Sequence, residues 1–206
     1  MIMSILAALA VVLNGCFSLK PASGQQQYYL LTGGSSNHSS GHGGGVCVVR
    51  VLPVEAPDYL RTRDMAVRTG DNAMIFNAFH EWAEPLDNGI RRVMVEDLRG
   101  APGIQNVLTD EPAPANAKVY IVSIHILSCE GNTSNGQSSV LFEAHWEISE
   151  SETPTPQAQG IFSPQPNPWR RDDYSDLATQ ISRSVEILSR VLNKALQAQV
   201  RTQEKR

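Results

Sequence analysis

The residues with most potential for chemistry lie in an alternating stretch past the middle of the chain. Val140 to Ile148 alternates apolar and polar residues, as a strand with one buried face does. This pattern points Glu143, His145 and Glu147 outward, and His125 could lie on a neighbouring strand. Carboxylates and imidazoles on one sheet face could bind a cation or act as acid and base. A solvated or subunit-facing sheet surface explains them equally well, and nothing places them in a cleft, so we favour the surface interpretation.

Other catalytic and metal motifs are incomplete. His38 and His42 stand in the Gly/Ser-rich stretch 33–45, where no thiol or carboxylate neighbours them and a flexible loop offers no fixed ligand geometry. His80-Glu81 lacks the second histidine of a zincin helix. The chain has no phosphate-binding G-x-x-x-x-G-K-[ST] loop, no G-x-S-x-G elbow and no C-x-x-C pair. We therefore predict a protein that is not an enzyme and that holds no cofactor and no metal; a periplasmic hydrolase is disfavoured.

The three cysteines divide into one near the N-terminus and two in predicted strands or strand ends, Cys47 and Cys129. In an oxidising compartment these two could form a disulfide, which would stabilise the fold by about 2–4 kcal/mol. They could equally be two separate apolar thiols in the core. The sequence leaves both alternatives open.

The N-terminal residues resemble a targeting signal. Residues 1–13 form an apolar run that is shorter than the roughly 20 residues needed to cross a bilayer, and that suits a secretory signal. The sequence Leu13-Asn14-Gly15-Cys16 resembles a bacterial lipobox, whose cysteine is lipidated and becomes the mature N-terminus. A plain signal peptide with an incidental cysteine is the alternative. We predict a signal peptide over 1–15 and a lipidated Cys16, with 16–27 as a short tether that keeps the domain close to its membrane.

Net charge and chain length indicate the class of protein and the number of domains. A formal net charge of -4 and a pI near 5.7 argue against a nucleic-acid-binding protein. The 206 residues suit one domain with extensions, which we place at 28–200 with a basic tail over 201–206.

Hydrophobic periodicity predicts an α/β fold of the α+β type, with a mainly antiparallel, twisted sheet and two helices packed on one of its faces. The helices are expected from Pro85 to Leu98 and from about Asp172 to Gln199, each with one apolar stripe. Residues 118–128 are apolar in both alternating sets, which predicts a central strand covered on both faces over much of its length. The remaining strands are expected at 28–31, 46–52, on either side of the turn Thr69-Gly70-Asp71-Asn72, and at 105–108, 140–148 and 158–163.

Several short motifs resemble one family. Val51-Leu52-Pro53 precedes Pro57-Asp58-Tyr59-Leu60, and the hairpin leads into a helix through Trp82-Ala83-Glu84-Pro85-Leu86. Tyr174 and Leu177 then open the amphipathic C-terminal helix. Together these resemble the PqiC family of auxiliary lipoproteins of ABC-type transport systems, over nearly the whole mature chain. Glu81, where the family usually has a basic residue, and the long Gly/Ser/His loop depart from the pattern.

The resemblance implies a non-enzymatic subunit of an MCE/Pqi-type lipid transport system. It would be anchored through Cys16 to the inner leaflet of the outer membrane, facing the periplasm, and would dock an MCE-domain periplasmic protein and its inner-membrane transporter. A homo-oligomer would suit the end of a lipid tunnel, although no residue demonstrates one. The motif residues that could form the docking surface are Tyr59, Leu60, Trp82, Pro85 and Leu86. For Trp82 we favour the alternative, in which its side chain is buried between helix and sheet. The alternative is a stand-alone periplasmic lipid carrier with its own apolar cavity.

Overall fold

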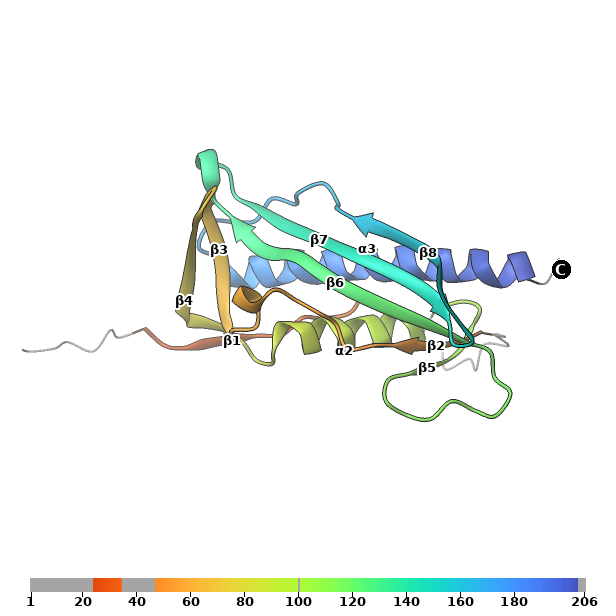
Figure 1. The fold of residues 1–206 in the computed structure, drawn as a ribbon. Helices are drawn as coiled ribbons and strands as arrows, with labels where there is room; N and C mark the ends of the chain where they lie inside the picture. Colours follow the sequence, from red (N-terminus) through yellow and green to blue (C-terminus); the bar gives the residue numbers. More distant parts are fainter. Residues whose placement is uncertain (1–23, 35–46, 100, 204–206) are drawn as a thin grey trace, which may run out of the picture.

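The computed structural model describes residues 24–34, 47–99 and 101–203 as one mixed sheet with two helices (Figure 1). The strands are β1 (Gln27–Tyr29), β2 (Cys47–Val51), β3 (Asp64–Gly70), β4 (Ala73–Trp82), β5 (Ile104–Leu108), β6 (Val119–Asn132), β7 (Ser139–Glu150) and β8 (Thr153–Phe162). The helices are α2 (Leu86–Arg99) and α3 (Tyr174–Gln203), and two short 3-10 turns are η2 (Asp58–Leu60) and η3 (Ser134–Gly136). The predicted signal peptide, Cys16, His38 and His42 lie outside the described residues.

The sheet is built around β6, which is 14 residues long. One edge of β6 pairs with β7 along nearly its whole length. The other edge pairs first with β2, at Val119 to Val122, and then with β3, at Gly131 and Asn132. A single bridge between Glu55 and His125 fills the interval between these two neighbours. The strand therefore ties the two halves of the sheet together.

The pairing corrects the prediction of a mainly antiparallel sheet. The antiparallel pairs are β3–β4, β6–β7 and β7–β8, each joined by a short turn. The pairs β1–β4, β2–β5, β2–β6 and β3–β6 are parallel. Strands that are close in sequence return on themselves through hairpins, whereas strands separated by long connections can align in parallel. The sheet is therefore mixed, while the α+β class is confirmed.

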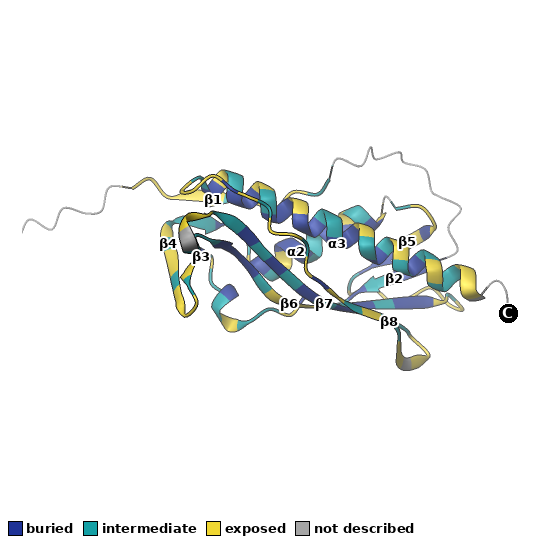
Figure 2. Ribbon diagram, turned by 90° about the horizontal axis from the view of Figure 1, so that it is seen from above, coloured by how far each residue is buried: buried dark blue, intermediate teal, exposed yellow. Residues whose placement is uncertain are grey.

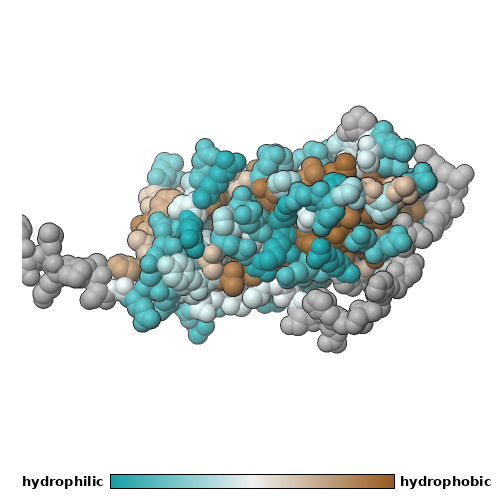
Figure 3. Space-filling view, turned by 90° about the horizontal axis from the view of Figure 1, so that it is seen from below, coloured by the Kyte–Doolittle hydropathy of each residue, from teal (hydrophilic) through white to brown (hydrophobic). Residues whose placement is uncertain are grey.

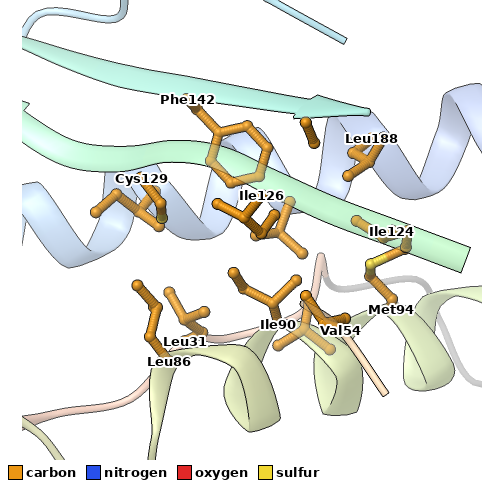
Figure 4. Close-up of a cluster of buried hydrophobic side chains, with 14 of the residues drawn as sticks. Leu31, Val54, Leu86, Ile90, Met94, Ile124, Ile126, Cys129, Phe142 and Leu188 are labelled. Carbon is orange, nitrogen blue, oxygen red and sulfur yellow. The ribbon is translucent and has the colours of Figure 1, made fainter. Parts of the chain in front are cut away.

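Both helices lie on one side of the sheet and pack against each other (Figure 2). The predicted stripe of α2 is buried, with Ile90, Val93, Met94 and Leu98 each at 0% exposure. Figure 4 shows side chains of α2 pointing toward Ile124, Ile126 and Cys129 of β6, with Leu188 of α3 closing the same cluster. In α3 the predicted stripe is buried from Leu177 to Leu192, but Leu196 rather than Ala195 completes it.

The helix starts follow from local chemistry. The carbonyl of Pro85 accepts a hydrogen bond from the Gly89 N–H at 3.0 Å, so Pro85 immediately precedes α2 instead of lying in its first turn. At α3, the Asp173 side chain accepts a hydrogen bond from the Asp176 N–H at 3.0 Å, which caps an otherwise unpaired donor. Neither helix combines the length and the apolar character required to cross a membrane, within the part of the chain that the structure describes.

The prediction that β6 is covered on both faces over much of its length holds only at the start of the strand, where the consecutive residues Val119 and Tyr120 are both buried, and is wrong further along. Val122, Ile124 and Ile126 are buried against the helices, but on the opposite face His125 and Leu127 are exposed, Leu127 by 46%. The apolar residues on that face do not mark a second layer, because the helices cover one side only. The strand also continues to Asn132, through residues for which the sequence predicts a loop.

Candidate functional site

Three of the five predicted docking residues belong to the core. Leu60, Trp82 and Leu86 are exposed by only 3%, 4% and 2%, so none of them offers a surface to a partner. All three belong to the main hydrophobic core, and Trp82, the last residue of β4, is a core residue as the alternative interpretation has it. Pro85 is exposed and Tyr59 is half-buried. Only these two remain available for docking.

Tyr59 contacts a buried carboxylate that the sequence analysis missed. Glu130, in β6, has a fully buried side chain. Its Oε1 accepts hydrogen bonds from Arg68 of β3, at 2.7 Å from one terminal nitrogen and 3.1 Å from Nε. Its Oε2 accepts one from the Tyr59 hydroxyl at 3.0 Å and one from the Cys129 N–H at 2.8 Å. Both oxygens are therefore saturated by the protein itself.

The hydrogen bonds around Glu130 suit a structural role better than a catalytic one. The hydrogen bonds to Glu130 raise the pKa of the Arg68 guanidinium, and burial beside the carboxylate raises the pKa of the Tyr59 phenol. Both groups therefore keep their protons at neutral pH. With four donors on two oxygens, the carboxylate has no open position for a substrate or a metal ion. The cluster joins η2, β3 and β6 on the sheet face away from the helices.

A second polar cluster joins β1, β4 and the start of α3. The His80 ring stacks on Tyr174 with centroids 4.1 Å apart, and its Nδ1 lies 2.8 Å from the Tyr29 hydroxyl. Asn77 donates to the Tyr174 hydroxyl at 3.1 Å. Burial lowers the pKa of the His80 imidazole, so the ring is neutral at physiological pH. Trp169 packs beside Tyr174, and its buried Nε1 has no hydrogen-bond partner among the described residues.

The outward polar set of the sheet is confirmed as a surface. His125 and His145 stand opposite each other on β6 and β7. His125 Nδ1 lies 3.2 Å from Glu55 Oε2, and His145 Nδ1 lies 3.9 Å from a Glu147 oxygen. The described ranges contain no group of three or more His, Cys, Asp or Glu residues arranged to hold a metal ion. Nothing in this row distinguishes it from a solvated sheet face.

The two thiols are separate. Val48 of β2, next to Cys47, pairs with Val119 of β6 in parallel, so Cys129 lies ten residues, or about 33 Å, further along β6 than Val119. A disulfide needs Cα atoms within about 7 Å, and both cysteines are free and buried in the structure. Burial raises the pKa of the Cys47 thiol to about 11 and raises that of Cys129 as well. Of the two alternatives, the structure has the inert core thiols.

An open groove of about 350 Å³ runs along the outer side of α2. Its lining is Asn88, Arg91, Arg92, Val95, Glu96, Arg99 and Thr109. Arg91 bonds the Val51 carbonyl and Asp110, while Arg92 bonds Glu84, so two of the cations already have partners. Figure 3 views the underside, where α2 lies, and shows hydrophilic groups over much of its middle with hydrophobic groups gathered toward the right-hand end. Six of the seven lining residues are charged or polar.

The sequence contains signals for some of the residues in these clusters, although the sequence analysis did not use them. Glu130 follows an apolar strand directly, and a charge at the end of such a run is a signal for a buried partner. The pairing with Arg68 was not visible, since it depends on the parallel contact between β3 and β6. The apolar run Met74-Ile75-Phe76 in β4 was also visible, but its exposure was not.

Comparison with known proteins identifies the family. The model of the ABC-type transport auxiliary lipoprotein component family matches residues 28–193. The fold resembles the crystal structure of a protein from Xanthomonas campestris, with a TM-score of 0.69 and 12% identity, covering 88% of this chain and 98% of that one. It also resembles the crystal structure of an uncharacterized protein, with a TM-score of 0.65 and 18% identity, covering 84% and 99%. No curated protein matches the sequence. The family match spans most of the chain and both structures share its fold, so the chain belongs to the ABC-type transport auxiliary lipoprotein component family.

Proposed function

We propose that this chain is the outer-membrane-anchored auxiliary lipoprotein of an MCE/Pqi-type ABC lipid transport system, in which it docks the periplasmic MCE assembly. The family match over residues 28–193 carries the proposal, because it names both a lipoprotein and an ABC-type transport system. Cys16 lies upstream of the matched segment, at the end of a signal-like apolar run, and is the residue that would carry the lipid. Several acyl chains, at roughly 0.8 kcal/mol per buried methylene, would make the attachment effectively permanent.

The interior of the domain favours docking over carriage. A carrier needs an apolar cavity for acyl chains, and the space between helices and sheet is filled by side chains from both layers (Figure 4). The groove along α2 is lined mainly by charged and polar groups. A docked assembly also has a physical purpose, since an apolar lipid crossing water meets a penalty of roughly 0.8 kcal/mol per methylene. Sealing the end of the path against the membrane avoids that penalty.

The open face of β6, β7 and β8 is the surface that we assign to the partner. Leu127 and Ile161 are exposed by 46% and 66% on strands whose other face is core. Tyr59 and Pro85 add the accessible part of the family motifs. Single exposed apolar side chains are normal on protein surfaces, and on this open sheet face they offer anchor points for a protein contact.

A matched pair of variants tests this assignment. Ile161→Glu places a charge in the proposed contact, while Gln159→Glu places the same charge one outward position away on the same strand. We expect crosslinked envelopes to yield several-fold less MCE-domain protein with Ile161→Glu than with Gln159→Glu. Recovery from Ile161→Glu as high as from the unsubstituted chain would remove the open sheet face from the contact.

The alternative of a stand-alone carrier has its own readout. A carrier purified from envelopes would bring about one phospholipid per chain, whereas the docking subunit would bring little. Deleting the gene should weaken the envelope barrier in the docking case, and a deletion strain with an unchanged detergent and antibiotic profile would count against it.

A further inference from the structure

Large apolar side chains gather at one end of the molecule. The described residues expose six of them, and four lie in or next to β1 and β4: Tyr28 at 55%, Leu30 at 54%, Ile75 at 50% and Phe76 at 43%. We call these four residues the apolar end. Figures 1 and 2 both place β1 and β4 at one extremity of the elongated domain, with the end of α3 at the other. The apolar end therefore lies at one end of the long axis of the domain and not along its side.

The strand β4 exposes apolar groups on both of its faces. Ile75 and Phe76 are adjacent in sequence, so their side chains point to opposite sides of the strand. One edge of β4 pairs with β3, but the other pairs with β1 only from His80 to Trp82, and the stretch before His80 has no strand on that side within the described chain. Edge strands of soluble domains are normally protected by charged residues or proline. Here the stretch from Ala73 to Phe79 contains neither.

The start of the described chain lies on this same strand. A Cβ at Gly24 would stand 2.7 Å from the Phe79 ring, so the chain enters the domain in contact with β4. Cys16 precedes Gly24 by eight residues, which reach about 26 Å at most when fully extended. The 30 residues of α3 span about 45 Å, so the far end of the domain is out of reach of an anchor at Cys16 unless the domain lies flat. The tether therefore holds the apolar end nearest to the bilayer.

The chemistry of the apolar end suits a lipid surface. Tyr28 and Phe76 are aromatic groups of the kind that settle at the boundary between headgroups and acyl chains. Arg63 lies over the Tyr28 ring at 5.8 Å, but it is paired with Glu81, and the exposed Arg61 is paired with Asp58. The apolar side chains, and not these two cations, therefore carry the contact. The exposed turn residues Asp71 and Asn72 limit the contact to a shallow one, because they must stay in the hydrated headgroup layer.

We propose that the apolar end, Tyr28, Leu30, Ile75 and Phe76, rests on the phospholipid bilayer that holds the anchor and fixes the orientation of the domain relative to it. This rests on the anchor assigned to Cys16 under the proposed function. The open sheet face and the end of α3 then project away from the membrane. A protein strand added to the unpaired stretch of the β4 edge, from a second copy or another protein, is the competing occupant. We favour the bilayer because the tether holds the apolar end close to it.

Site-specific photocrosslinking in native envelopes tests the proposal on the full chain. A benzophenone amino acid would replace Phe76 in one variant and Tyr28 in another, with Ile161 as the control, since Ile161 is more exposed than either but lies on β8. All three positions are on the surface, so the fold is retained. After irradiation, mass spectrometry of the purified chain distinguishes a phospholipid adduct from a protein adduct.

The result expected is a phospholipid adduct at positions 76 and 28, in several-fold excess over position 161. Protein adducts alone at position 76, from a second copy or from another envelope protein, would overturn the proposal, and so would equal lipid adducts at all three positions. The intact mass of the same samples reports whether Cys16 carries lipid. A lipidated chain without lipid adducts at position 76 would refute the membrane contact and leave the proposed function standing.

Discussion

Glu130 is a buried charge for which the surrounding residues compensate. Its carboxylate is removed from water and is compensated by Arg68, Tyr59 and a backbone N–H. A buried charge is tolerated only while such partners are in place, and removing one of them leaves the charge exposed to a low-dielectric interior. The family motif residue Tyr59 therefore acts first as a structural group.

We predict that Arg68→Met lowers the free energy of unfolding by about 3 kcal/mol, because it leaves the Glu130 carboxylate without its counter-charge. In a Glu130→Gln background the same substitution should lower it by at least about 1 kcal/mol less. Denaturant titrations of the four chains measure this coupling. Equal losses in both backgrounds would mean that the pair is not coupled.

The substitution Tyr59→Phe tests whether the Tyr59 hydroxyl stabilises the fold or contacts the partner. The substitution removes the 3.0 Å hydrogen bond to Glu130, and we expect it to lower the free energy of unfolding by about 1–2 kcal/mol. Recovery of the MCE partner should be unchanged at a temperature where the variant is folded. A loss of partner without a loss of stability would instead place the Tyr59 hydroxyl in the contact.

Asp97 gives a pH-dependent prediction. Burial raises the pKa of its carboxyl, with Glu186 and Glu96 adding to the effect and hydrogen bonds from Ser189 and Gly34 opposing it. Its Oδ2 has no hydrogen-bond partner among the residues that the structure describes. A raised pKa in the folded state means that this carboxyl supports folding only while protonated, below its unfolded value of about 3.9, and that the support is lost as pH rises through the folded pKa. Asp97→Asn should therefore raise the melting temperature at pH 7, with a gain that vanishes by about pH 4. Thermal unfolding across this range checks it, and a gain independent of pH would contradict it.

At the scale of elements, the fold depends on how β6 meets its neighbours. Gly131 lies where β6 passes β3, and a Cβ there would stand 3.0 Å from the Trp169 ring, 3.2 Å from Val67 and 3.3 Å from Leu177. Three separate elements converge on this position, so none of them can move away independently. The close approach is what allows β3 to join the sheet.

We predict that Gly131→Ala lowers the free energy of unfolding by about 1–3 kcal/mol, since it overpacks this junction. Gly70→Ala is the matched control, because a Cβ there would contact only the Ala73 Cβ, at 3.9 Å. The control should be neutral or slightly stabilising. Chemical denaturation compares the two variants, and similar losses in both would rule out crowding at Gly131 as the cause.

The local part of this fold was predictable from the sequence, whereas the non-local part was not. The apolar stripes placed both helices, and strict alternation placed the buried face of β7 from Val140 to Ile148. Hairpin signals placed β3 and β4. The parallel pairs join strands that are distant in sequence, and periodicity carries no information on which distant strands meet. The family motifs suggested Trp82 and Leu86 as possible docking residues, with the core as the favoured place for Trp82, and both are buried in the core.

At the scale of the whole molecule, the two ends of the domain have different roles in this account. The apolar end lies where the tether enters, and the open sheet face with Leu127 and Ile161 remains for a protein partner. Among the described residues, apolar side chains from the helices and the sheet pack together in the core between them. This division is what an adaptor between a membrane and a transport assembly requires.

The central claim is that this lipoprotein docks a transport assembly and does not carry lipid by itself. The most direct measurement is gentle crosslinking in native envelopes, purification of the full chain through a C-terminal tag, and mass spectrometry of the proteins and lipids recovered. The account predicts that an MCE-domain protein and its permease are enriched, with little phospholipid bound to the chain alone. Recovery of the chain by itself, with about one phospholipid in each copy, would contradict it.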